Sequence, residues 1–510
     1  MRKLAELPAD DINRFIGRYS IGRDSSPLDT MGSLHFLRVK VPGGFITSEQ
    51  LRGIAKIAET YGRNQGEITD RQDIQLHWID AEDSLNIFSR MEELGFATDM
   101  CGQGFTGPEY GDVRNIVCCP ASGVDEAELV DGRSLLKKLN EYFLGNNDFD
   151  NMPRKFKASI TGCGSDCTRA VINDLALAAV DKEGEAGYAL LTGGGVGPSL
   201  PGPRLAKPLG IFVHPEEAFD LMVAIIEIHR DHGSRESKAK ARFKWLFDVW
   251  GKEKFTKALE AKMGKSLDRY DGPVFAREDT HYGVQPQRQG GLYYVNVPTL
   301  GGRVSNREMR LFADLSDMFG NGDIRLTPRQ NIILSNIRDK DALLGRLAEE
   351  GVTLEGSYLK YNSVGCASDF CGKTVNPHSK ETLRQAVNHL EDRFEERLLN
   401  EARIRLHVSG CPNNCCAKEI ATVGLSGALT KSGDVTKQVY DIFLGGEFGI
   451  KTSTGRSVEL RVPAEIIPDK IEHLLASYAA KRKPSEKLAD FCSRLSTEEL
   501  KSCLEAAKET

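Results

Sequence analysis

Four cysteines in the C-terminal half form two close pairs. Cys366 and Cys371 have four residues between them, Cys411 and Cys415 have three, and one helical segment separates the pairs. Four thiolates brought together in this way suit a [4Fe–4S] cluster or a tetrahedral zinc ion. Zinc knuckles usually separate each pair by about two to four residues and lie in small excursions, whereas each of these pairs follows a predicted strand of a large globular half. The spacing favours the cluster, with zinc as the alternative.

Basic residues are concentrated in short motifs that open predicted strands. In the PRKFK motif, side chains alternate between the two faces of the strand, so Lys155 and Lys157 project to one side and Arg154 to the other. Two ammonium groups on one face repel each other unless that face is solvated or carries an anion. Arg71 (TDRQ) and Arg114 (GDVRN) occupy similar strand starts. Each alone indicates only a surface charge or an ion pair, but the lysine strand runs straight into a Gly-Cys element, as the strand of a site would.

The sequence contains an internal duplication. Each half contains a strand, a helix opened by a capping box and a closing strand, which together form a β-α-β half-module. The strands are predicted at 34–42 and 70–79 in the first copy and at 292–298 and 328–337 in the second; the capping boxes pair Thr47 with Gln50 and Ser305 with Glu308.

The remainder of each half repeats as well. ASITGCGSDC (158–167) aligns with LHVSGCPNNC (406–415), and Cys119 aligns with Cys366. Five such matches keep the same order, at offsets between 247 and 258 residues. A duplicated unit usually folds into two similar halves about a pseudo-two-fold axis, with a site in the cleft between them. Two independent copies that share no site are the less favoured alternative.

Length and composition exclude several classes of protein. A chain of 510 residues is too long for one hydrophobic core and predicts two to four domains. The net charge of −6 argues against a nucleic-acid partner, and no stretch approaches the roughly 20 apolar residues of a membrane span. The N-terminus has no apolar core of the signal-peptide kind, and clustered cysteines among the twelve in the chain indicate metal or redox chemistry. A cytoplasmic protein is expected. The three cysteines outside the clusters, Cys101, Cys492 and Cys503, are expected to be small buried side chains.

Together these motifs resemble the siroheme-dependent nitrite and sulfite reductase family, and the resemblance covers nearly the whole chain. It is carried by TDRQDIQLHWI, GDVRNIVCCP, MPRKFKASITGC, INDLAL, GGGVG, RLAKPLG, KARFKWLFDVWG, LTPRQNIIL and SGCPNNC. It implies an α+β, duplicated fold with ferredoxin-like half-modules and two siroheme-binding α/β domains. The expected division is a half-module at 1–105, a siroheme-binding domain at 106–284, a second half-module at 285–350, and a second siroheme-binding domain with the cluster cysteines at 351–510.

The resemblance also assigns roles to residues. It implies a [4Fe–4S] cluster on Cys366, Cys371, Cys411 and Cys415, with Cys415 also the axial ligand of the siroheme iron. Arg71, Arg114, Lys155 and Lys157 match the substrate-binding basic residues on the open face of the siroheme. Asn413, Asn115, Gln72 and Arg154 fall in motifs that line the macrocycle. A pocket of this charge suits siroheme, which carries eight carboxylates, and an anionic substrate that needs protons as its oxygens leave.

The expected reaction is the six-electron reduction of sulfite to sulfide, because many nitrite-type relatives have asparagine where this chain has Lys157. Reduction of nitrite to ammonia by the same machinery is the alternative, and a zinc-stapled binding protein is the alternative from another class. The chain contains no flavin or nicotinamide fingerprint and no ferredoxin cysteine run. Electrons must therefore come from a separate partner, with ferredoxin expected before a flavoprotein subunit.

The chain departs from the family pattern in two places. The family usually places five residues between the first pair of cysteines, whereas Cys366 and Cys371 have four. The first half also holds Cys119, Cys163 and Cys167 at positions equivalent to three cluster ligands. A second metal site, with Cys118 or a non-cysteine group as the fourth ligand, is one interpretation. The favoured interpretation is a relic of the duplication, with these cysteines filling small buried positions.

Overall fold

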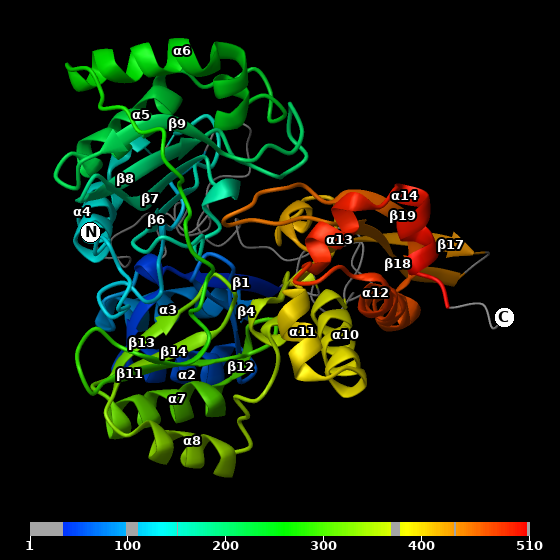
Figure 1. The fold of residues 1–510 in the computed structure, drawn as a ribbon. Coiled ribbons are helices and arrows are strands. Elements are labelled where there is room, and N and C mark those ends of the chain that lie inside the picture. The colour runs from blue at the N-terminus through cyan, green and yellow to red at the C-terminus, as the bar shows by residue number, and fades with distance from the viewer. Residues whose placement is uncertain (1–33, 98–110, 150, 369–377, 433–434, 507–510) are drawn as a thin grey trace.

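The structure, a computed structural model, describes residues 34–97, 111–149, 151–368, 378–432 and 435–506. The two half-modules lie together on one side of the molecule, the first large domain lies beside them, and the second large domain forms the remaining lobe (Figure 1). The mixed, duplicated α+β fold predicted from the sequence is confirmed by the sheet topology.

The two half-modules exchange a strand with each other. One sheet has the order β1-β4-β3-β12 and the other the order β10-β11-β14-β13-β2, so each contains one short strand from the other half. The first sheet comprises β1 (Leu34–Val39), β4 (Ile74–Asp80), β3 (Gln65–Ile68) and β12 (Arg303–Ser305); the second comprises β10 (Gly283–Pro286), β11 (Tyr293–Val297), β14 (Ile332–Ile337), β13 (Asp323–Leu326) and β2 (Phe45–Thr47). Side chains from both sheets form one hydrophobic core. The four-part division of the sequence stays a prediction, but in space the two half-modules are interlocked.

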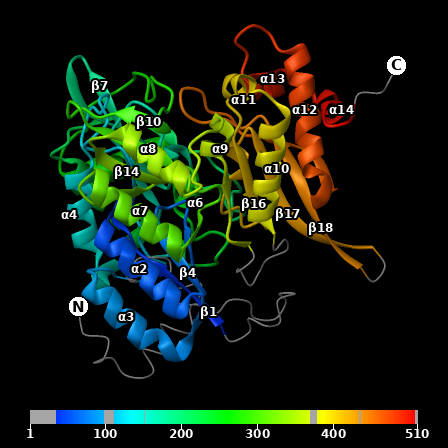
Figure 2. The same cartoon turned by 90° about the horizontal axis from the view of Figure 1, so that it is seen from below.

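Both predicted capping boxes are present. Thr47 Oγ1 accepts from the Gln50 backbone N–H at 3.1 Å and opens α2 (Ser48–Tyr61), and Ser305 does the same for α7 (Asn306–Phe319) through Glu308. The two helices pack against each other (Figure 2). The helices α3 (Ser84–Glu93) and α8 (Lys340–Glu349) flank this pair. The equivalent helices of the two copies therefore share the core that the strand exchange creates.

The two large domains each contain a five-stranded sheet, and the two sheets have the same topology. The order is β5-β6-β7-β8-β9 in the first half and β15-β16-β17-β18-β19 in the second, and in each sheet the first two pairings are parallel and the last two antiparallel. The first sheet comprises β5 (Val117–Cys118), β6 (Ala158–Thr161), β7 (Leu175–Lys182), β8 (Glu185–Thr192) and β9 (Lys207–Val213); the second comprises β15 (Val364–Gly365), β16 (Leu406–Ser409), β17 (Val423–Ser432), β18 (Val435–Leu444) and β19 (Arg456–Pro463).

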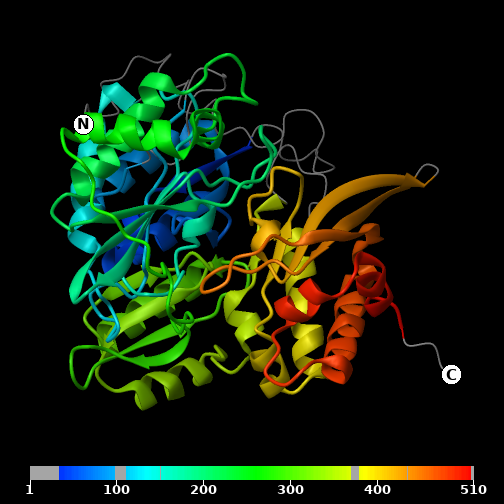
Figure 3. The ribbon, with the colours of Figure 1, turned by 45° about the horizontal axis from the view of Figure 1, so that its top comes forward.

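Helices cover each of these sheets (Figure 3). The first sheet shares a hydrophobic core with α4 (Arg133–Phe143), α5 (Ala218–His232) and α6 (Phe243–Met263). The second sheet shares its core with α9 (Tyr358–Asn362), α10 (Ser379–Arg393), α11 (Glu396–Ala402), α12 (Ile467–Lys481), α13 (Leu488–Arg494) and α14 (Thr497–Cys503). Of the three lone cysteines, Cys492 and Cys503 are buried in the second core as predicted, and Cys101 lies outside the described residues.

Two strands predicted from the sequence begin later than expected. The strands predicted at 70–79 and 328–337 begin four residues late, at Ile74 and Ile332, because the preceding residues form a turn.

A turn that is repeated in both halves explains the late strand starts. The Thr69 hydroxyl oxygen accepts from the backbone N–H groups of Arg71 and Asp73, and Thr327 repeats this pattern two residues before Arg329. Such hydroxyl-to-backbone bonds compete with strand pairing. The glutamine in each turn, Gln72 or Gln330, has a φ near +65° (64° and 66°).

Each turn glutamine joins three parts of the fold. Gln72 Nε2 donates to the carbonyls of Cys118 and Leu326 at 3.0 and 2.8 Å, and Gln72 Oε1 accepts from the Cys118 N–H. Gln330 makes the equivalent bonds with Ile68 and with both backbone groups of Gly365. The side chain thus ties one half-module to the other and to the first strand of a large sheet, once in each half.

No helix among the described residues is long and apolar enough to cross a membrane.

Candidate active site

The predicted cluster cysteines stand at one edge of the second large sheet. Cys366 follows β15 directly and Cys411 follows β16 by two residues, and these two strands are parallel neighbours. The Cys366 N–H donates to the Val408 carbonyl at 3.1 Å, which extends that ladder. Since parallel strands end at the same edge, the two cysteines are brought together there. Cys366 and Cys411 are half-buried, Cys415 is exposed, and Cys371 lies outside the described residues.

The environment of Cys366 favours a thiolate. The Gly410 backbone N–H donates to its sulfur at 3.0 Å, and the Ser379 hydroxyl lies 3.5 Å away. The neighbouring Cys416 thiol, followed by Ser379 and Gly410, lowers the pKa of Cys366 to about 7 against the effect of burial. A metal ligand must be deprotonated, so these donors prepare the sulfur for a cation.

The basic residues of the first half face this edge. Phe156 pairs with Val113 in a parallel bridge, so the GDVRN and PRKFK segments run side by side, and the Arg114 N–H donates to the Phe156 carbonyl at 2.9 Å. Arg71 reaches the same region from its turn, where it donates to Asn173 at 3.0 Å and to the Ala158 carbonyl at 3.3 Å. Arg114 is paired with Asp112 at 2.6 Å.

The pKa values of both lysines are set by burial and by nearby charges, among them the Cys415 thiol. Burial, then Lys157 and nearby arginines, lower the pKa of Lys155 well below its ordinary value, while Cys415 acts in the opposite direction. Burial, then Arg71, lower the pKa of Lys157 to about 8, opposed by Asp70 and more weakly by Cys415. Within the described part of the chain, neither ammonium group makes an ion pair or a side-chain hydrogen bond.

Three further polar residues, which no pattern in the sequence marks as part of a site, organise this face. Asp174 accepts from the Lys157 backbone N–H at 2.8 Å and pairs with Arg242 at 2.9 Å. Lys244 is buried and donates to the carbonyls of Gly195 and Gly197 at 3.0 and 2.8 Å, which fixes the glycine-rich loop. The KARFKW motif contains both basic residues, but only the fold shows what they bind.

The glycine-rich loop of the first half meets the cysteine loop of the second. The Asn414 side chain donates to the Val196 carbonyl at 2.8 Å, and a Cβ on Gly197 would lie 4.0 Å from the Asn413 carbonyl. Gly195 has a φ of +152°, in the region that favours glycine. The loop therefore brings the cysteine edge of one half against the basic face of the other.

The residues predicted to line the macrocycle fall into two groups. Asn413 is exposed and Arg154 is half-buried, so both have surface to offer a ligand. Gln72 and Asn115 are buried, and their side-chain amides bind the backbone and, for Asn115, the Asp73 carboxylate at 2.7 Å. These two position Arg71 and its neighbours.

Both predicted cofactors fit the residues at this site. Buried guanidinium N–H atoms of Arg71, Arg169 and Arg242 have no hydrogen-bond partner among the described residues, and the two lysines add unpaired charge. Unsatisfied buried donors are costly, and a polycarboxylate such as siroheme would satisfy them. The three described thiols at adjacent strand ends suit a metal cluster, as does the N–H donor to Cys366.

Comparison with known proteins identifies the family. The family described as "Nitrite and sulphite reductase 4Fe-4S domain" matches residues 109–267 and 373–510. The "Nitrite/Sulfite reductase ferredoxin-like half domain" matches residues 29–94 and 285–349. The chain belongs to the nitrite and sulfite reductase family. Each of the two descriptions matches twice, which reproduces the duplication seen in the sequence and in the sheets.

Relatives in this family resemble the chain over most of its length. The assimilatory ferredoxin-dependent nitrite reductase of Haloferax mediterranei is 31% identical over 93% of this chain and 84% of its own. The ferredoxin–nitrite reductase of Synechococcus elongatus is 33% identical over 86% and 85%, and sulfite reductase [ferredoxin] 2 of Mycolicibacterium paratuberculosis is 30% identical over 91% and 83%. The solved structure of the Mycobacterium tuberculosis NirA protein superposes with a TM-score of 0.86 at 27% identity, covering 98% of this chain and 93% of that one.

Family membership gives the chemistry in general form. The chain is an oxidoreductase that reduces nitrite or sulfite, with siroheme and a [4Fe–4S] cluster as its cofactors. The expectation of a zinc-stapled binding protein is set aside by this assignment.

Proposed function

We propose that the enzyme reduces sulfite to sulfide in preference to nitrite. The observation that supports this is the pair Lys155 and Lys157, two half-buried ammonium groups near Cys415 that make no ion pair within 4.0 Å among the described residues. Sulfite carries two negative charges and nitrite one, so a second ammonium at the binding face favours sulfite. The names of several relatives favour nitrite as the second candidate, because those from Haloferax mediterranei and Synechococcus elongatus are nitrite reductases.

In this proposal the cluster is held by Cys366, Cys371, Cys411 and Cys415, and the siroheme by Cys415 together with Asn413, Arg154 and the arginines of the pocket. When bound there, these cofactors would supply the redox chemistry of the reduction. Arg71, Arg114, Lys155 and Lys157 bind and orient the anion. Asp174 fixes the backbone of Lys157, and Gln72 and Asn115 hold the turn that carries Arg71.

The lysines also hold the protons that the reaction consumes. A proton donor works best with a pKa near the working pH, and Lys157 has a pKa of about 8. Lys157 is mostly charged at neutral pH, yet it releases its proton more readily than an ordinary lysine. The same group therefore attracts the anion and delivers a proton as an oxygen leaves.

Replacing Lys157 by asparagine tests the choice of substrate. Lys157→Asn removes one charge and keeps a hydrogen-bond donor, so the dianion loses about twice as much attraction as nitrite. We expect the ratio of sulfite to nitrite kcat/KM to fall about tenfold, equivalent to about 1.4 kcal/mol, with siroheme and iron contents unchanged. Both substrates should be assayed side by side, and Lys182→Asn, at the far end of β7, is the matched control. An unchanged ratio would remove the support for sulfite.

The pH dependence of the reaction gives a second test. Because burial and then Arg71 lower the pKa of Lys157 to about 8, the charged form is complete below that pH and is lost above it. We expect kcat/KM for sulfite to fall as the pH rises through about 8, since this parameter reports the free enzyme. Lys157→Asn should abolish that limb of the profile. A wild-type profile that stays flat well above pH 8, or a variant that keeps the limb, contradicts the assignment.

We also propose that ferredoxin is the electron donor, because the relatives from Haloferax mediterranei, Synechococcus elongatus and Mycolicibacterium paratuberculosis carry ferredoxin in their names. The assays above should therefore use reduced ferredoxin, with an NADPH-linked flavoprotein as the comparison. The cytoplasm stays the predicted location, in keeping with thiols held ready for metal rather than for disulfides.

A further inference from the structure

Three buried cysteines of the first half converge on a histidine. The ligand atoms of Cys119, Cys163, Cys167 and His281 all lie within 4.8 Å of one another. The Cys163 sulfur is 4.0 Å from that of Cys119 and 3.7 Å from that of Cys167. All four side chains are buried, and the three cysteines pack in a small apolar cluster with Tyr294 and Ile333. This group is separate from the predicted cluster cysteines, which belong to the other half.

We propose that Cys119, Cys163, Cys167 and His281 bind a structural zinc ion. Structural zinc is four-coordinate, and three cysteines with one histidine are a common ligand set. A Zn–S bond of about 2.3 Å makes the edge of a regular tetrahedron about 3.8 Å, and the two measured sulfur separations bracket that value. The thiolates of a [4Fe–4S] cube bind different irons and stand farther apart, so these separations fit a single ion.

The duplication explains how the fold builds this site. The Cys119 N–H donates to the Ile160 carbonyl at 3.0 Å, as the Cys366 N–H does to Val408 in the other half, so both sets stand at the ends of two parallel strands. The difference is the fourth ligand. His281 comes from the segment just before β10, and its backbone carbonyl accepts from Asn296 at 2.6 Å. The first half thus offers an imidazole from the connection between the halves where the second half has a cysteine close in sequence.

Carboxylates orient the imidazole. His281 Nε2 lies 2.9 Å from Asp125, and Nδ1 lies 3.1 Å from Asp279. Nδ1 makes no hydrogen bond among the described residues, so it is the nitrogen open to the ion, and Nε2 then keeps its bond to Asp125, which is the usual support for a metal-binding histidine. Arg329 pairs with Asp279 and donates to the Cys167 carbonyl at 3.3 Å. Arg329 is the duplicate of Arg71, so one copy of the turn arginine serves the substrate face and the other supports this site.

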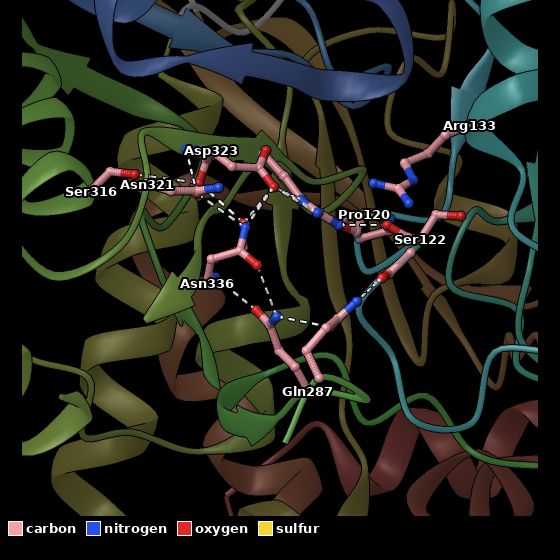
Figure 4. Close-up of polar contacts among 12 residues, drawn as sticks. Pro120, Ser122, Arg133, Gln287, Ser316, Asn321, Asp323 and Asn336 are labelled. Atoms are coloured by element: carbon pink, nitrogen blue, oxygen red, sulfur yellow. Dashed lines mark hydrogen bonds and ion pairs between the residues drawn. The ribbon is translucent and has the colours of Figure 1, made fainter. Parts of the chain in front are cut away.

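The loop that follows Cys119 is anchored to the second half-module. Arg325 is buried, donates to the carbonyls of Pro120 and Ser122 at 3.1 and 2.7 Å, and is held by Asp323. Gln287 and Asn336 continue the network on the side of the half-module (Figure 4). Cys119 directly follows β5 of the first large sheet, and His281 lies just before β10 of the second half-module. A bound zinc would therefore fasten this sheet to that half-module.

Metal analysis of the purified holoenzyme tests the proposal. We expect about one zinc per chain, in addition to the siroheme iron and about four non-haem irons. The X-ray absorption spectrum of the zinc should show about three sulfur ligands and one nitrogen ligand. Cys163→Ser and His281→Ala should each lose most of the zinc and unfold at a lower temperature. Cys118→Ser, equally buried but outside the group, should keep it. Cys411→Ser, at the position equivalent to Cys163, should lose cluster iron and keep the zinc.

Four results would overturn the zinc assignment: a wild-type protein without zinc whose three thiols titrate freely after unfolding, as a relic would; a disulfide among these cysteines; zinc that is lost with Cys411 rather than with Cys163; and a non-haem iron content near eight that falls with Cys163→Ser, which indicates a second cluster. The spectroscopic measurement on the wild type keeps the test decisive if a variant fails to fold. Zinc content is read independently of siroheme absorbance and of turnover, so this proposal and the sulfite proposal fail separately.

Discussion

Cys415→Ser is expected to yield a protein deficient in siroheme and in cluster iron, with sulfite reduction lowered at least about a thousandfold, or about 4 kcal/mol. A serine hydroxyl is a poor ligand for soft metals, and Cys415 is the residue proposed to bind both cofactors. Its exposed side chain lies between the cysteine edge of one half and the lysines of the other. The siroheme absorbance, the non-haem iron content and the turnover of the purified variant measure the effect.

Cys416→Ser is the matched control. Cys416 is buried, and its thiol lies next to that of Cys366, so it belongs to the packing around the site. We expect this variant to keep siroheme and cluster at lower stability, because its side chain turns away from the exposed face. If Cys415→Ser retains normal siroheme, iron and activity, or if Cys416→Ser is the more damaging of the two, the ligand assignment is wrong.

The duplication could be predicted from the sequence because both copies keep their local signals. The capping boxes of α2 and α7 lie 258 residues apart and both form as predicted. The exchange of β2 and β12 could not be predicted, because a three-residue strand carries no pattern that names its partner. The start of β4 was misjudged for another reason. The polar residues of the TDRQ turn run directly into the alternating residues of the strand, and only the hydroxyl bonds of Thr69 reveal the turn.

The candidate site was partly predictable for a similar reason. Lys155 and Lys157 share a face because strand geometry requires it, and Cys366 and Cys411 meet because their strands are parallel neighbours. His281 gave no signal, since a single histidine outside any motif is most often structural. Its convergence with Cys163 depends on the path of the chain between the halves. Long-range pairings such as Arg242 with Asp174 are likewise fixed by packing rather than by spacing in the sequence.

A buried charge network joins the half-modules to the cluster domain. Glu67 on β3 is 1% exposed and bonds to Arg303 at 2.9 Å, to Lys380 at 3.1 Å and to His77 at 3.2 Å. Burial opposes ionisation of Glu67, but Lys380 and then the other two groups hold its pKa well below the usual range. A carboxylate of this kind stabilises the fold above the pKa it has in the unfolded chain, and the stabilisation is lost as the pH falls below about 4.

Glu67→Gln is expected to lower the free energy of unfolding by about 3–5 kcal/mol, because it leaves the buried ammonium group of Lys380 without its carboxylate partner. The effect should reach the site. Ser379, next to Lys380 at the start of α10, donates to the Cys366 carbonyl at 2.9 Å, so a loosened helix start should also lower cluster occupancy. Urea unfolding and iron analysis of the same preparation measure both effects.

The exposed pair of Glu349 and Arg346 provides the control, since Glu349→Gln should cost less than about 1 kcal/mol. Adding Lys380→Met to Glu67→Gln should recover part of the loss, because the cation left unpaired is then gone. If Glu67→Gln costs no more than Glu349→Gln, the network does not hold the two parts together.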